Sequence, residues 1–198
     1  MNRRFLLLAL ASAIMLGGGI VYELTKPPSF YGSVITPPAS MPDFTLQSVN
    51  GPVKLSDFWG KYVLLYFGYT SCPDLCPTTL AKLQQVVTRQ ADWMPQVQVI
   101  FVSVDYLRDT PEKLNSYVRS FSDGFIGITG TKEQIDVVTR EYGIYYKLNT
   151  SDPQTDFYSV DHSASVLVFN RQGEMVLTWP YGLDVYQMAS DLQELLNR

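Results

Sequence analysis

Buried strands are the clearest elements that the pattern of hydrophobic and polar residues predicts. Residues 62–67 and 97–104 are nearly continuous runs of aliphatic, β-branched and aromatic residues. Such runs, without polar alternation, are typical of strands buried on both faces of a sheet. Apolar residues on both sides of Asn50-Gly51 predict a β-hairpin, because that dipeptide suits a two-residue turn. Further strands are predicted at 125–128, 144–148, 164–169 and 174–178.

Helices are predicted between these strands, where apolar residues recur every three or four positions. Thr110 followed by Pro111 is typical of a helix start, because threonine can cap a helix and proline suits its first turn. Thr131 followed three residues later by Gln134 resembles a capping box. The predicted helices span 77–90, 111–121, 131–142 and 185–197, and a short helical turn spans 56–61.

This order of elements predicts the fold class. Strands that alternate with helices, and end in a hairpin and a helix, indicate an α/β sandwich. The polar segment 149–158 is interpreted as an exposed loop or a hairpin. The only two cysteines of the chain follow the first long strand. A cysteine pair in that position favours a thioredoxin-like fold.

The N-terminal segment is predicted to cross a membrane. Residues 5–22 contain no charged side chain and follow Arg3-Arg4. As a helix they would extend about 27 Å, close to the roughly 30 Å of the hydrocarbon core of a bilayer. The preceding positive charges keep the N-terminus in the cytoplasm and send the rest of the chain across. A cleaved signal peptide is the alternative, whereas the lack of a cysteine near residue 20 excludes lipoprotein processing.

The chain therefore divides into a membrane anchor at 1–22, a tether at 23–40 and a folded domain at 41–198. The tether contains four prolines, which favour an extended chain, although its second half could equally be an ordered arm on the domain. No long leader rich in arginine and serine precedes the anchor. The expected location is therefore the inner membrane of a bacterium, with the domain facing the periplasm.

Composition and charge narrow the class of function. Hydrophobic residues make up 46% of the chain, and aromatic residues 13%, which is enough for a sizeable core. The net charge is −4, and since the first 22 residues contribute two arginines and no acid, the remainder carries −6. An acidic domain of this kind is a poor candidate for binding nucleic acid.

Cys72 and Cys76 carry the strongest chemical signal in the sequence. Both lie where the predicted strand 62–67 passes into the predicted helix 77–90. A helix N-terminus favours thiolate, so we expect a lowered thiol pKa here. Residues four apart on a helix share one face, so both sulfurs would point the same way. The alternative is a structural disulfide or two buried thiols.

His162 is the only histidine of the chain. A soft metal would therefore be held by Cys72, Cys76 and His162, because no other cysteine or histidine exists. Two thiolates and one imidazole suit Cu(I), and a further position could accommodate Cu(II). Zinc bound by the same residues with an open position is the alternative. A loop position for His162 would keep such a site open to exchange.

Several segments resemble the SCO/SenC family of copper-handling, membrane-anchored proteins. Residues 42–44 and 55–61 are similar to the opening that this family shares with peroxiredoxin-like relatives. Residues 67–78, which include both cysteines, are similar to its metal-binding stretch. Residues 108–112 and 161–165 are also similar to family segments. The resemblance extends from about residue 41 to the end of the chain.

The resemblance implies a thioredoxin fold with an extra hairpin and one copper ion per chain, Cu(I) or Cu(II), bound by Cys72, Cys76 and His162. It also implies a role in building the dinuclear copper centre of cytochrome c oxidase. The expected partners are the copper-bearing oxidase subunit and an upstream periplasmic copper donor. One departure is Tyr106, where relatives often have proline; it lies away from the expected ligands.

Residues near the expected ligands allow more than one interpretation. Asp161 either orients His162 or forms a turn. Asp74 is a helix cap or meets a partner surface. Arg108 and Asp109 form a surface pair or lie near the site. Three aromatic residues are assigned to the core: Trp59, Phe67 and Tyr69.

Two main functions follow from these residues. The first is a copper metallochaperone, which exchanges ligands and turns over no substrate. The second is a thiol–disulfide oxidoreductase that reduces the cysteines of the oxidase before copper is inserted, with Cys72 and Cys76 as its redox pair. Three residues rather than two separate the cysteines, which favours chelation together with His162. A copper or redox sensor is a third hypothesis, and the residues around Cys72 argue against a peroxidase.

Overall fold

The computed structural model describes residues 29–150 and 157–197. The predicted anchor at 5–22 lies outside these residues, as does the first part of the predicted tether. Among the helices of the described ranges, none combines the length and the apolar character that crossing a bilayer requires.

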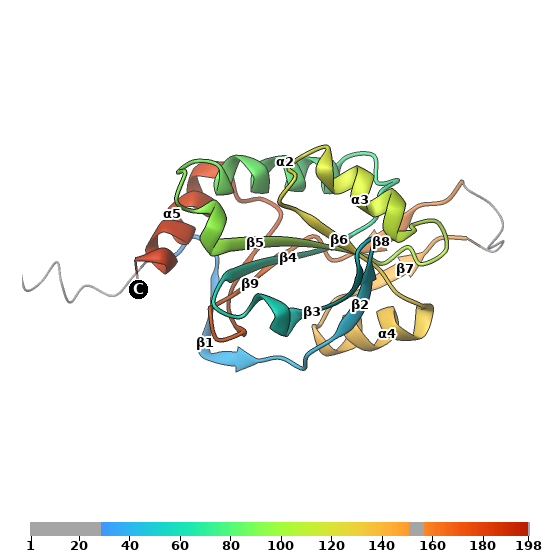
Figure 1. Cartoon of the computed structure of the whole chain (residues 1–198), viewed down its shortest axis with the longest axis horizontal. Helices are drawn as coiled ribbons and strands as arrows, with labels where there is room; N and C mark the ends of the chain where they lie inside the picture. The colour runs from blue at the N-terminus through green and yellow to red at the C-terminus, as the bar shows by residue number, and fades with distance from the viewer. Residues whose placement is uncertain (1–28, 151–156, 198) are drawn as a thin grey trace, which may run out of the picture.

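A six-stranded mixed sheet forms the centre of the described structure (Figure 1). Its strand order is β1-β10-β9-β4-β5-β6, in which β4, β5 and β6 are parallel and the other neighbours pair antiparallel. Every residue of β4 and β5 is buried, so the two strongest strand predictions are confirmed. The strands of the sheet are β1 (Ser33–Ser40), β4 (Tyr62–Gly68), β5 (Val97–Ser103), β6 (Ile126–Ile128), β9 (Val166–Phe169) and β10 (Glu174–Trp179).

Helices cover both faces of this sheet. Figure 1 shows α2, α3 and α5 on one side and α4 on the other. Thr110 accepts the backbone N–H of Lys113, and Thr131 forms the predicted capping box with Gln134. All four predicted helices are confirmed, with ends that differ by at most three residues. They are α2 (Leu75–Val87), α3 (Pro111–Arg119), α4 (Lys132–Glu141) and α5 (Val185–Leu196), with short 3-10 helices η1 (Leu55–Phe58) and η2 (Met94–Gln96).

Two hairpins accompany the sheet. The predicted one pairs β2 (Thr45–Ser48) with β3 (Gly51–Lys54) around the Asn50-Gly51 turn. The second pairs β7 (Tyr146–Leu148) with β8 (Val160–His162). Most of the segment predicted as an exposed loop or a hairpin, residues 151–156, lies outside the described residues. A mixed sheet between helical layers, with the cysteines at the junction of β4 and α2, is the thioredoxin-like arrangement that the sequence predicts.

The second half of the predicted tether is an ordered arm. β1 pairs with β10 at the edge of the sheet. The buried carboxylate of Asp191 in α5 fixes the entry to this strand, because it accepts the backbone N–H groups of Tyr31 and Gly32 at 2.8 and 2.9 Å. The same carboxylate accepts the indole N–H of Trp179 at 2.9 Å. Of the two alternatives for this segment, the structure therefore has the ordered arm from residue 33 to 40.

The assignment of Trp59 to the core is wrong. This side chain is 65% exposed, because it follows η1 in a surface turn. Its indole lies against Gly173, where an added Cβ would come within 2.4 Å of the Trp59 Nε1. Phe67 and Tyr69, the other two aromatic residues assigned to the core, are buried as predicted.

Candidate metal centre

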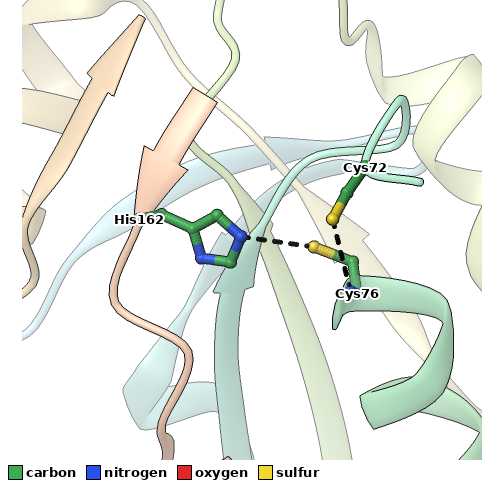
Figure 2. Close-up of side chains that lie close together, drawn as sticks. All are labelled: Cys72, Cys76 and His162. Atoms are coloured by element: carbon green, nitrogen blue, oxygen red, sulfur yellow. Dashed lines mark hydrogen bonds between the residues drawn. The ribbon is translucent and has the colours of Figure 1, made fainter. Parts of the chain in front are cut away.

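Two cysteines four residues apart and a histidine 86 residues further along the chain converge beside the end of β4. The sulfur atoms of Cys72 and Cys76 and a ring nitrogen of His162 all lie within 4.8 Å of one another. Figure 2 shows the two sulfurs and the imidazole pointing toward one another, and the His162 Nε2 is 3.5 Å from the Cys76 Sγ. The structure thus brings together all three residues that the sequence singles out as metal ligands.

The two cysteines are presented by different local structures. Cys72 lies in the loop after β4, where its N–H donates to the carbonyl of Tyr69 at 3.3 Å. Cys76 lies in the first turn of α2, and its N–H donates to the Cys72 Sγ at 3.5 Å. The spacing of four predicts that the cysteines share a helix face, but they do not, because Cys72 lies before the helix. The loop before α2 turns the sulfur of Cys72 back toward the helix N-terminus.

Gly68 makes room for the sulfur of Cys76 at the end of β4. A Cβ on Gly68 would lie 2.6 Å from the Cys76 Sγ and 2.8 Å from a ring carbon of Phe101. Both distances are too short for a real side chain. Glycine is therefore needed here so that the first turn of α2 can place its thiol directly against the strand end.

Burial dominates the acidity of Cys76. The residue is 0% exposed, and loss of hydration raises the pKa of its thiol to about 12. The neighbouring Cys72 adds to this rise, whereas hydrogen bonds from the Tyr69 backbone and the Tyr66 hydroxyl oppose it. The predicted lowering of the pKa is therefore wrong for Cys76, because loss of hydration outweighs the effect of the helix N-terminus.

His162 presents a neutral imidazole with a defined tautomer. It is the last residue of β8, where it pairs with Tyr146, and not a loop residue as expected. Its Nδ1 donates to the carbonyl oxygen of Ser163 at 3.0 Å, which leaves the lone pair of Nε2 directed at the sulfurs. Burial is the main cause that lowers the pKa of His162. The rings of Tyr66 and Tyr69 pack edge-on against the imidazole, with ring centroids 6.2 and 5.8 Å from its own.

Asp161 does not hold the His162 ring, and the Asp74 side chain does not cap α2. Asp161 is exposed, and it is Ser163 that holds the Nδ1 of His162. Asp74 occupies the N-cap position of α2, but its side chain accepts from the Thr78 hydroxyl at 3.2 Å and caps no backbone N–H. Neither carboxylate belongs to the ligand cluster.

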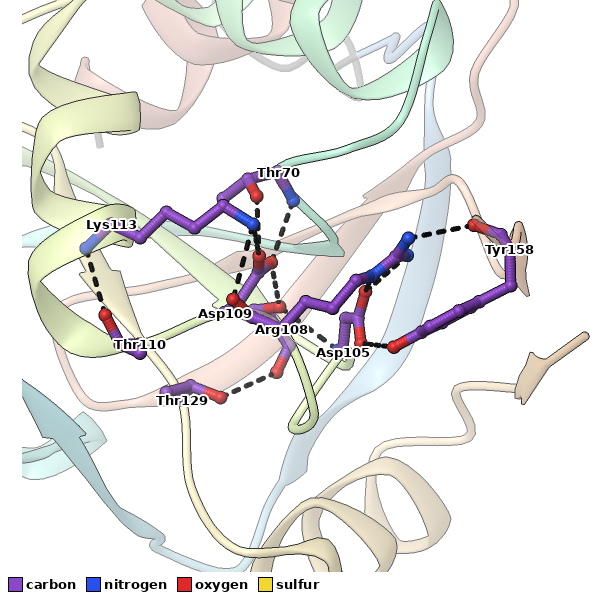
Figure 3. A network of polar contacts seen from close by, with 9 residues as sticks. Thr70, Asp105, Arg108, Asp109, Thr110, Lys113, Thr129 and Tyr158 are labelled. Carbon is purple, nitrogen blue, oxygen red and sulfur yellow. Dashed lines mark hydrogen bonds and ion pairs between the residues drawn. The ribbon is translucent and has the colours of Figure 1, made fainter. Parts of the chain in front are cut away.

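Arg108 and Asp109, by contrast, belong to a buried polar network beside the site (Figure 3). The side chain of Arg108 is 8% exposed and forms an ion pair with the fully buried Asp105. Asp109 is also buried, and it accepts the N–H and the hydroxyl of Thr70 at 2.8 and 2.5 Å. The surface-pair alternative for these residues is therefore wrong, and Thr70 and Asp105 were not identified from the sequence.

Tyr66 is a second neighbour that the sequence does not distinguish from an ordinary core residue. Its hydroxyl donates to the Cys76 Sγ at 3.8 Å. Burial raises the pKa of Tyr66, so its hydroxyl stays protonated and remains a donor. The only signal in the sequence is that Tyr66 places a hydroxyl group in an otherwise apolar stretch of strand.

The cluster is chemically suited to a soft, low-coordinate metal ion. It offers two sulfurs and one imidazole nitrogen, and no carboxylate of the described residues joins it. Cys76 is fully buried, while Cys72 keeps 9% of its surface exposed and His162 is partly buried. The surface that the three ligands expose therefore belongs to Cys72 and His162.

Comparison with known proteins finds a family model and curated relatives that match this chain. A family model described as SCO1/SenC matches residues 34–197. The SCO2 homologue from Bos taurus is 44% identical over 135 residues, which are 66% of this chain and 50% of the bovine protein. The chain thus spans about half the length of the curated relatives it matches.

Solved structures share both fold and sequence with this chain. The apo Sco1 protein from Thermus thermophilus has a TM-score of 0.77 at 37% identity, covering 84% of this chain and 97% of its own. ScoI from Arabidopsis thaliana, solved with copper bound, has a TM-score of 0.73 at 31% identity, covering 81% of this chain and 100% of its own. These matches confirm the thioredoxin-like α/β fold of the domain.

Proposed function

Because this chain belongs to the SCO1/SenC family, we propose that it binds one copper ion through Cys72, Cys76 and His162 and delivers it during cytochrome c oxidase assembly. ScoI from Arabidopsis thaliana and yeast Sco1 were solved with copper bound, and BsSco is a member of the Sco family of cytochrome c oxidase assembly proteins. The observation that carries the proposal is the convergence of these three ligand atoms within 4.8 Å. Copper is the cargo of the protein rather than a resident cofactor.

The exposure of the three ligands supports an order of events for transfer. A ligand of the acceptor protein approaches from the side where Cys72 and His162 meet solvent. Cys72 and His162 are released first, and the fully buried Cys76 last. Each step exchanges one metal–ligand bond for another, so the copper is never free in water. This route turns over no substrate, in keeping with a carrier rather than an enzyme.

The partners and location follow from the same proposal. The acceptor is the copper-bearing subunit of cytochrome c oxidase, and a periplasmic copper donor loads the site. The uncharged segment 5–22 after Arg3-Arg4 anchors the chain in the inner membrane of a bacterium with the domain in the periplasm. The second half of the predicted tether is β1, so the domain would be attached to the membrane through the sheet edge that β1 forms.

Copper titration tests this proposal. The full chain, reduced and held in detergent, should bind one Cu(I) per chain and pass it to the isolated oxidase copper subunit. Cys72→Ser, Cys76→Ser and His162→Ala should each weaken binding strongly, because no other cysteine or histidine can replace the lost ligand. Unchanged affinity in His162→Ala would remove that residue from the ligand set. Binding without any transfer would restrict the role to copper storage or sensing.

A thiol–disulfide oxidoreductase is the second candidate, because the structure holds Cys72 and Cys76 as free thiols close together. In that reaction the two thiols become one disulfide while a disulfide of the oxidase subunit becomes two thiols, so two electrons and two protons pass to the partner. The reaction needs no imidazole. The contribution of His162 therefore separates the two candidates.

A further inference from the structure

One loop, between β5 and α3, contacts both halves of the metal site. Residues 105–109 of this loop bond to the segment that carries the cysteines and to the hairpin that carries His162 (Figure 3). We propose that Arg108 is a positioning residue, which holds the β7–β8 hairpin so that His162 stays in reach of both sulfurs. The proposal rests on the metal-binding function proposed above.

In the segment that leads to His162, Arg108 and Asp105 both contact Tyr158. The Arg108 Nε and Nη2 both lie 2.6 Å from Asp105 Oδ2, and Nη1 donates to the Tyr158 carbonyl at 3.0 Å. The guanidinium stacks over the Tyr158 ring, 3.5 Å from its centroid. The Tyr158 hydroxyl donates a hydrogen bond to Asp105 Oδ1 at 2.5 Å. Tyr158 thus has its ring, hydroxyl and backbone fixed, four residues before His162 and two residues before β8 begins.

On the cysteine side, the next residue of the same loop fixes Thr70. The Asp109 carboxylate accepts the N–H and the hydroxyl of Thr70, at 2.8 and 2.5 Å, two residues before Cys72. Ser103 and Lys113 donate to the same carboxylate at 2.6 and 2.9 Å. Because Arg108 and Asp109 are adjacent, the loop sets the separation between the two segments that bear the ligands.

The planar fork of arginine suits this task, and lysine cannot replace it. Arg108 directs separate nitrogens to a carboxylate and to a carbonyl while its flat face stacks on a ring. A lysine ammonium is a single point charge without that geometry, though it preserves the charge beside the buried Asp105. Arg108→Lys is therefore the informative variant, since removing the cation would leave Asp105 buried and unpaired.

Hydrogen exchange of the reduced, metal-free full chain in detergent gives the first readout. Arg108→Lys and Tyr158→Phe should speed exchange of the backbone N–H groups of residues 160–163, including Ser163, which donates to Tyr145 at 2.9 Å. Exchange in β4 and β5 should stay as in the unmodified chain. Two matched controls should change nothing: Tyr145→Phe, an exposed tyrosine beside β7, and Arg119→Lys, whose ion pair with Asp123 is exposed.

Competition titration with Cu(I) gives the second readout. Arg108→Lys should lower affinity about 10- to 100-fold, the usual effect of losing a group that orients a metal ligand. In the His162→Ala background the same substitution should have no further effect, because Arg108 acts through His162. An additional loss in that background, or faster exchange throughout β4 and β5, would overturn the proposal in favour of general stabilisation. If the unmodified chain binds no copper, the metal function fails, while the exchange data still decide whether Arg108 holds the hairpin.

Discussion

The hydroxyl of Tyr66 donates a hydrogen bond to the sulfur of Cys76 at 3.8 Å, and both side chains are fully buried. Tyr66 belongs to β4 and Cys76 to α2, so the contact ties the central strand to the first turn of the helix. A donor aimed at a metal-binding sulfur withdraws electron density from it. Tyr66 is thus placed to tune the sulfur without binding the metal itself.

Tyr66→Phe should therefore alter the spectrum of the copper-loaded chain more than its stability. Without the donor, the Cys76 thiolate gives up electron density more readily, so the sulfur-to-Cu(II) charge-transfer band should move to longer wavelength. Unfolding free energy should change by no more than about 1.5 kcal/mol, the range for one hydrogen bond. Visible absorption and urea denaturation measure the two effects.

Tyr62→Phe is the matched control for this variant. Tyr62 lies in the same strand, and its hydroxyl donates to the carbonyl of Leu195 at 2.5 Å, away from the sulfurs. Its loss should cost a similar amount of stability and leave the absorption band unchanged. Equal band positions in Tyr66→Phe and the unmodified chain would show that the hydroxyl has no influence on the bound metal.

Gly68→Ala should damage both the fold and the site. The new methyl group would lie 2.6 Å from the Cys76 Sγ and 2.8 Å from the Phe101 ring, so α2 must move away from β4. We expect a loss of about 1–3 kcal/mol in unfolding free energy, as for other overpacked cores, together with weaker copper binding. Denaturation and Cu(I) competition test this. Gly182→Ala, where an added Cβ meets nothing within 4 Å, should leave copper binding unchanged.

The central fold could be predicted because it depends on local pattern. β4 and β5 are apolar along almost their whole length, and Thr110 and Thr131 mark helix starts through caps that are visible in the sequence. The β8 strand has no such signal, since only Val160 of its three residues is buried. β8 pairs with β7, and Tyr158, two residues before β8, bonds to Arg108 and Asp105. The bonds to Arg108 and Asp105 join residues far apart in the sequence, so a local pattern does not reveal them.

The ligands of the site could likewise be predicted, but not their environment. Cys72, Cys76 and His162 are conspicuous because the chain has no other cysteine or histidine. The acidity of Cys76 was predicted in the wrong direction, since a helix N-terminus is visible in the sequence and complete burial is not. For the same reason, the sequence does not decide whether Arg108 and Asp109 form a surface pair or lie near the site.

Copper binding should release a proton from Cys76. Burial raises the pKa of its thiol to about 12, so the thiol is protonated at pH 7 and must lose its proton to bind the metal. Burial also lowers the pKa of His162, so the imidazole is already neutral above its usual value of about 6.5 and releases none. Apparent affinity should therefore rise at least about tenfold per pH unit between pH 7 and 8.

Calorimetry in buffers of different ionisation enthalpy counts these protons. His162→Ala should bind copper more weakly but release the same number of protons at pH 7 as the unmodified chain. Fewer released protons in that variant would show that the imidazole is protonated before copper binds. A pH-independent affinity would show that Cys76 is not deprotonated on binding.

The final prediction concerns cells and separates copper delivery from thiol reduction. Cells that lack this protein should have low cytochrome c oxidase activity, and added copper should restore part of it if delivery is limiting. His162→Ala should behave like Cys72→Ser and Cys76→Ser at ordinary copper, because delivery needs all three ligands. Reduction needs only an attacking and a resolving thiol, so a reductase would keep its function without the imidazole.

The measurement is oxidase activity of the three variant strains across a series of copper concentrations, with the membrane level of each variant followed by immunoblot. Tyr145→Phe serves as the control, since this exposed side chain lies outside the ligand cluster. We expect all three ligand variants to fail at low copper. A fully active His162→Ala strain at low copper, beside inactive cysteine variants, would refute delivery and establish reduction, because the imidazole is the one ligand that thiol exchange does not use.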